Sequence, residues 1–163
     1  MRSASVALGL AVVVLALAGC APTVPLSPAA DAINPACARV IVHLPATVAE
    51  LPARETNAQG TGAWGTPAMV ILRCGVPVPA PTSALPCVTV DGVDWLRDDS
   101  KDPDFVFTTY GRTPAIEVIV DSDGDPQVPD DGVSGLTALT DLSFAVSSIS
   151  PTARCISPDG TAG

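Results

Sequence analysis

Five cysteines carry the clearest chemistry in the sequence. They are Cys20, Cys37, Cys74, Cys87 and Cys155. Thiols form disulfides in exported proteins, and closely spaced thiols bind zinc. No two of these cysteines have the Cys-x-x-Cys spacing of common zinc sites, so disulfides are the favoured chemistry. An odd number leaves one cysteine unpaired, and Cys20 stands apart because it ends an apolar run.

The surroundings of Cys20 indicate export and lipid attachment. Arg2 precedes an apolar stretch over residues 6–18, which is shorter than the ~20 residues of a membrane-spanning helix. The following "LAGC" resembles the recognition sequence of the bacterial lipoprotein signal peptidase. That resemblance implies cleavage after Gly19 and a lipid on Cys20, which would hold the chain at the outer face of the plasma membrane. An uncleaved N-terminal anchor is the alternative.

With Cys20 assigned to lipid, four cysteines remain, and four cysteines allow three disulfide pairings. We expect Cys74–Cys87, which would close a short proline-rich loop, and Cys37–Cys155, which would join the start of the domain to its end.

The residue types of common catalytic sites are scarce. His43 is the only histidine and falls in an expected helix. The stretch "GVSGL" is not a Gly-x-Ser-x-Gly elbow. Aspartates are numerous, among them Asp94, Asp98 and Asp99. The sequence does not show that any two of them face the same scissile bond of a substrate, as glycoside hydrolysis requires. We therefore predict no catalytic residues and no cofactor, and favour a non-enzymatic protein. A small hydrolase with an acidic site is the alternative.

Three alternating aspartates, Asp121, Asp123 and Asp125, resemble the opening of a calcium loop. The pattern then fails, because Pro126 stands where a glycine is needed and Gly132 where the bidentate glutamate is needed. We predict a solvated acidic loop and no metal site, with calcium as the alternative.

Four residues near predicted turns or strand ends form a candidate ligand-binding set: Trp64, Trp95, Tyr110 and Arg112. Core packing is the alternative for both tryptophans, and it is favoured for both, more strongly for Trp95 than for Trp64. Arg112 in a tight turn would bind an anion or, as the favoured alternative, an acidic group of the protein surface.

The charge balance restricts the partners. The chain has 17 acidic and 8 basic residues, so removal of Arg2 with a signal peptide changes the formal net charge from −9 to 7 − 17 = −10. Such a surface argues against nucleic acid. The expected partners are the membrane, through the lipid, and an envelope protein or the cell wall.

The elements that would position these groups begin after residues 1–19, the signal peptide. Residues 20–33 contain three prolines and are expected to form a lipid-anchored tether. Residues 34–163 have the size of one domain. Asn34 and Pro35 predict the start of a helix that ends near Pro45.

Strands are expected over 66–75 and on both sides of Asp91-Gly92, a dipeptide typical of two-residue hairpin turns. Two more are expected around Gly111-Arg112, and a second helix over 133–149, where "LSFAV" as a strand is the alternative. The predicted fold is α+β, a mostly antiparallel sheet of about five strands with two helices packed on one face, stapled by disulfides.

Four stretches together resemble a known family: "NPAC", "GAWGTPAMVILRCG", "CVTVDGVDWL" and "TTYGRTPAIEV". They are similar to small exported actinobacterial lipoproteins catalogued as domain of unknown function 3515. The resemblance implies an envelope location and a disulfide-containing domain. It implies no reaction and carries over no catalytic residue.

Overall fold

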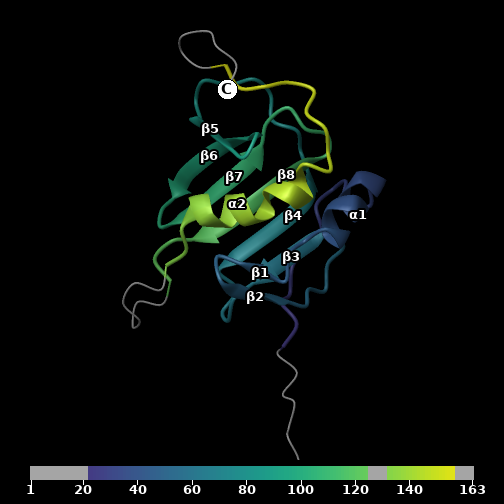
Figure 1. The fold of residues 1–163 in the computed structure, drawn as a ribbon, viewed down its shortest axis with the longest axis vertical. Helices are drawn as coiled ribbons and strands as arrows, with labels where there is room; N and C mark the ends of the chain where they lie inside the picture. Colours follow the sequence, from purple (N-terminus) through teal and green to yellow (C-terminus); the bar gives the residue numbers. More distant parts are fainter. Residues whose placement is uncertain (1–21, 125–131, 157–163) are drawn as a thin grey trace, which may run out of the picture.

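The computed structural model describes residues 22–124 and 132–156. They form one eight-stranded antiparallel sheet and two helices (Figure 1). The strands are β1 (Thr47–Val48), β2 (Leu51–Arg54), β3 (Thr61–Trp64), β4 (Val70–Val76), β5 (Cys87–Val90), β6 (Val93–Lys101), β7 (Asp104–Thr109) and β8 (Ala115–Asp121). Their order across the sheet is β1-β2-β3-β4-β8-β7-β6-β5.

The predicted sheet of about five strands is wrong, because the sheet has eight. The expected strands correspond to β4–β8, and β1, β2 and β3 were missed. These three are two to four residues long. The turn between β1 and β2 uses Ala49 and Glu50 at positive φ, where glycine or asparagine is usual, so the sequence lacks the common hairpin signal.

Both helices begin at side-chain caps. In α1 (Pro35–Val42) the Asn34 side chain accepts a hydrogen bond from the Ala36 N–H at 3.0 Å, as the sequence predicts. In α2 (Gly135–Val146) the Ser134 hydroxyl accepts from the Thr137 N–H. The segment containing "LSFAV" is therefore helical. Figure 1 shows α2 lying across the sheet, and α2 contacts α1, β1, β5 and β8.

The main core lies between the helices and one face of the sheet. The central strands contribute alternating apolar residues to it, including Val70, Leu72 and Cys74 of β4, and Ile116, Val118 and Val120 of β8. Helix α2 contributes five buried residues: Ala138, Leu139, Leu142, Ala145 and Val146. Leu136, near the start of α2, is 65% exposed, and the buried residues of the helix begin at Ala138.

The four cysteines of the domain form two disulfides, but in a pairing that differs from the predicted one. Cys37 bonds to Cys74, which ties α1 to β4, and Cys87 bonds to Cys155, which ties β5 to the C-terminal segment. A Cys74–Cys87 bond is not feasible, because three strands separate β4 from β5. Four strand spacings amount to roughly 19 Å, whereas bonded cysteines have Cα atoms within about 7 Å.

Residues 22–33, expected as part of a tether, lie against the domain. Val24 bridges Thr56, and Ala29 and Ala32 pack with residues of β4 and β8. The Asp31 N–H donates to the carbonyl of Gly75, at 3.0 Å. Gly75 permits this close approach, because a Cβ there would lie 2.5 Å from the Ala32 nitrogen. Pro22–Ile33 therefore covers one end of the central strands.

Candidate functional site

The two tryptophans of the predicted ligand-binding set lie in the core. Trp64 is 1% exposed and Trp95 is 0% exposed. The Trp64 indole N–H donates to the Pro45 carbonyl at 3.1 Å, which fixes the chain after α1 against β3. Both indoles therefore act in packing, which was the alternative interpretation, and neither offers a surface to a ligand.

Arg112 is 3% exposed, and its partners are main-chain carbonyls rather than an acidic group of the surface. Its guanidinium donates to the Ile149 carbonyl and to the Gly92 carbonyl, which also accepts from Arg154 at 2.7 Å. Burial, followed by the nearby Arg154 charge, lowers the pKa of Arg112. These contacts join the β5–β6 turn to the chain after α2.

Tyr110, the fourth residue of that set, lines a surface cavity on the face of the sheet opposite to α2. Arg154, Leu96 and the Cys87–Cys155 disulfide share this cavity. The structure therefore does not bring the predicted set together.

The aspartates of β6 lie in different environments. Asp94 is 2% exposed and accepts hydrogen bonds from the Thr89 hydroxyl at 2.7 Å and the Cys155 N–H at 2.9 Å. Its carboxylate thus holds the C-terminal segment against the β5–β6 hairpin. Asp98 accepts from the Ser100 N–H at 2.9 Å, which lowers the pKa of the Asp98 carboxyl.

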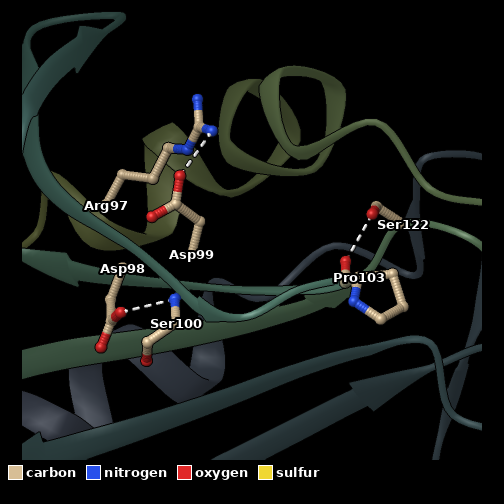
Figure 2. A network of polar contacts seen from close by, with 6 residues as sticks. All are labelled: Arg97, Asp98, Asp99, Ser100, Pro103 and Ser122. Atoms are coloured by element: carbon tan, nitrogen blue, oxygen red, sulfur yellow. Dashed lines mark hydrogen bonds and ion pairs between the residues drawn. The ribbon is translucent and has the colours of Figure 1, made fainter.

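Figure 2 shows Arg97 and Asp99 on the α2 side of the β6 strand, with Asp98 on the opposite side. Successive residues of a strand point to opposite faces, so Asp98 and Asp99 do not converge on one bond. Figure 2 also shows the Ser122 hydroxyl donating to the Pro103 carbonyl, which attaches the β6–β7 turn to the end of β8.

The expected acidic loop is described only in part, because Asp125 lies outside the described residues. Asp121 accepts from the Gly124 N–H at 2.8 Å. Partial desolvation, then a hydrogen bond and charge repulsion from Asp121, raise the pKa of Asp123. Within residues 22–124 and 132–156, no group of three His, Cys, Asp or Glu residues could hold a metal ion.

His43 terminates α1. Its Nδ1 lies 2.6 Å from the Arg39 carbonyl oxygen, and its ring meets the edge of Phe144 with centroids 5.5 Å apart. These contacts give His43 a capping role at the junction of the two helices.

The best-defined candidate site is an apolar cavity between α2 and the end of the sheet formed by β5, β6 and β7. Its volume is about 260 Å³. Its lining comprises Val88, Val90, Arg97, Phe105, Phe107, Gly135, Leu136 and Leu139. We call this space the α2–β5 cavity. A pocket of this size accepts a short apolar group, since sites for drug-sized ligands start at about 300 Å³.

Helix α2 comes close to the sheet at its first residue, Gly135, which also lines the cavity. A Cβ on Gly135 would lie 2.8 Å from Cζ of Phe107. Glycine therefore lets α2 begin directly above Phe107, while the Leu136 side chain stays at the surface. Sequence reasoning missed this site because its walls come from four elements. Only the alternation of Val88 with Val90 indicated that both face one side.

One charged group, Arg97, belongs to this apolar lining. Its guanidinium carbon lies 4.8 Å from the centroid of the Phe105 ring, a cation–π contact. Its Nη2 forms an ion pair with Asp99 at 3.1 Å, and both side chains are partly exposed. Its Nε is buried and has no hydrogen-bond partner among the described residues. The cavity therefore combines apolar walls with an incompletely satisfied cation.

These features define a class of protein, a disulfide-stapled α+β domain with an apolar cavity beneath one helix. The chain belongs to the family described as "Protein of unknown function (DUF3515)", which matches residues 4–155. This finding confirms the resemblance of the sequence to this domain of unknown function. No curated protein and no solved structure matches the chain. No helix in the described ranges is long and apolar enough to cross a membrane.

Proposed function

We propose that this protein is a lipid-anchored component of the cell envelope whose domain binds a partner or ligand outside the plasma membrane. The "LAGC" motif at residues 17–20 supports the anchor, although these residues lie outside the described part of the chain. Two disulfides support an oxidising compartment, because they persist in exported proteins and are rare in the cytosol of mesophiles.

The observation that carries the binding role is the α2–β5 cavity. Protein interiors are close-packed, so a cavity of about 260 Å³ open at the surface is a place where an added group gains contacts. The disulfides and the continuous sheet hold its walls in place, so a ligand would meet a preformed site.

The anchor is tested with Cys20→Ala in the full chain. The variant should lose incorporation of labelled palmitate and should leave the membrane fraction, because the thiol that carries the lipid is gone. Thr23→Ala, three residues away and exposed, is the matched control and should behave like the unaltered protein. Full membrane retention of Cys20→Ala would contradict the proposed anchor.

A second candidate function is a small envelope hydrolase, or an accessory factor of envelope biosynthesis, with an acidic site. The raised pKa of Asp123 beside the Asp121 carboxylate favours it, since a carboxyl with a perturbed pKa is typical of acid–base sites. Turnover of a cell-wall fragment that Asp123→Asn abolishes, and that Asp98→Asn leaves unchanged, would establish this alternative.

A further inference from the structure

We infer that the α2–β5 cavity binds the end of an anionic amphiphile, a short apolar chain that terminates in a carboxylate or a phosphate. The inference deepens the proposed binding role and rests on it. It follows from three properties of the cavity: its apolar walls, its single cation and its size.

The walls select an apolar group. Val88 and Val90 form one side, Phe105 and Phe107 form the floor, and Leu139 closes the cavity beneath α2. A chain seated here removes its own apolar surface and that of the walls from water, at roughly 25 cal/mol per Å². Seven of the eight lining residues carry no polar side-chain atom, so the chain meets no competing hydrogen-bond group on these walls.

The single cation selects the charge of the ligand. A guanidinium has five N–H donors, and within the described residues Arg97 uses one of them, toward Asp99. Its buried Nε has no partner among the described residues, so the guanidinium is incompletely satisfied. An oxygen pair of a carboxylate or phosphate fits the guanidinium fork with two parallel hydrogen bonds. The exposed pair with Asp99 is weak enough for such a ligand to displace it or share it.

The size limits how much of the ligand enters. A volume of about 260 Å³ is roughly nine times the share of one water molecule in the liquid. The cavity therefore holds one short chain rather than a whole membrane lipid. Because Arg97 lines the same space as the apolar walls, this one cavity receives both the short apolar chain and the charged group at its end.

The test measures binding of octanoate, octyl phosphate and 1-octanol, below their micelle concentrations, by calorimetry. It uses the full chain carrying Cys20→Ala, which has no lipid of its own to compete for the cavity. The anchor plays no part in this measurement, so failure here and failure of the proposed anchor are distinguishable. We expect both anions to bind more tightly than octanol. Whichever of octanoate and octyl phosphate binds more tightly shows whether the cavity prefers a carboxylate or a phosphate at the end of the ligand.

Arg97→Ala should weaken binding of the anions about tenfold, since a charge-assisted hydrogen bond is lost, and should leave octanol binding within twofold. Arg39→Ala, which removes an exposed cation of α1, is the matched control and should change neither. Asp99→Asn should strengthen binding of the anions, because it removes the competing carboxylate.

Two variants at the rim of the α2–β5 cavity keep the test informative if another variant fails to fold. Leu136 is exposed, so Leu136→Lys and Leu136→Glu should both fold. The lysine should tighten anion binding and the glutamate should weaken it. Val88→Trp should fill the cavity and abolish binding of every probe.

Three results would overturn the inference. Octanol could bind as tightly as the anions, Arg97→Ala could leave anion binding unchanged, or no probe could bind at millimolar concentration. The last result would indicate that the cavity receives a side chain of a partner protein instead.

Discussion

Asp94, Arg97 and Asp98 lie within five residues of one strand and differ completely in environment. Asp94 is buried and holds the C-terminal segment, Arg97 faces the cavity, and Asp98 accepts a hydrogen bond from Ser100 of the same strand. The alternation of the strand places Arg97 on the face opposite to Asp94 and Asp98, and the neighbouring elements decide which part of each face is covered.

Asp94→Ala should lower the free energy of unfolding by about 1–3 kcal/mol, because the Thr89 hydroxyl and the Cys155 N–H lose a buried acceptor. Urea titration followed by circular dichroism measures the change. Asp99→Asn, in an exposed ion pair, is the control and should stay within about 0.5 kcal/mol. Equal effects of the two variants would contradict the structural role of Asp94.

Asp123 should titrate above the ordinary aspartate pKa, and Asp98 below it. Carbon-detected NMR of the carboxyl groups measures both. Since the raised pKa disfavours the ionised form in the folded state, Asp123 opposes folding once the pH rises through the interval between its ordinary and its folded pKa.

Asp121→Asn should move the pKa of Asp123 back toward the ordinary value, because a neighbouring charge is removed. The pKa of Asp98 should not move in this variant and serves as the internal control. An unchanged pKa of Asp123 would show that Asp121 does not perturb it.

At the scale of elements, the two disulfides fasten parts that the sheet alone does not hold. Cys37–Cys74 joins a helix to a central strand, with Cα atoms 5.5 Å apart. Cys87–Cys155 joins the edge strand β5 to the last described segment, with Cα atoms 6.3 Å apart. Because β5 also forms one wall of the α2–β5 cavity, this second bond supports the candidate site.

Joint replacement Cys37→Ala and Cys74→Ala should lower the free energy of unfolding by about 4 kcal/mol, as the loop-closure relation gives for residues 37 apart in sequence. Denaturant titration measures this loss. Peptide mapping without reduction should recover Cys37 linked to Cys74, and Cys87 linked to Cys155. A peptide that links Cys74 to Cys87 would refute the observed arrangement of β4 and β5.

At the scale of the whole molecule, the chain before α1 forms part of the structure. The Pro22 carbonyl accepts a hydrogen bond from Arg54, and the Leu26 N–H donates to Asn57. Ala32 packs at the end of the central strands. If Cys20 carries a lipid, the domain would be held close to the membrane, because few residues separate Cys20 from these contacts.

Deletion of residues 22–32 should therefore destabilise the domain by about 3 kcal/mol, since several hydrogen bonds and two buried alanines are lost. Thermal unfolding of the shortened chain beside the full chain measures the change. Deletion of residues 157–163 provides a comparison at the other terminus. An unchanged melting temperature after deletion of 22–32 would restore the expectation of a free tether.

Local patterns predicted those features that depend on neighbouring residues. Asn34 and Pro35 marked the start of α1, and Asp91-Gly92 marked the β5–β6 turn, where both residues have positive φ. The apolar stretches indicated β4 and β8. The short strands β1–β3 gave no such pattern, because they are held by pairing with one another and, through β3, with β4 rather than by their own composition.

The sequence by itself determined the family, the start of α1, the segments that form β4–β8 and the presence of four cysteines able to pair. Each follows from residue types within a short window. Only the tertiary structure decided which cysteines meet, that both tryptophans are buried, and that Arg97 joins two valines and two phenylalanines around one cavity. The physical reason is the strand order, which places β8 between β4 and β7 and separates β4 from β5.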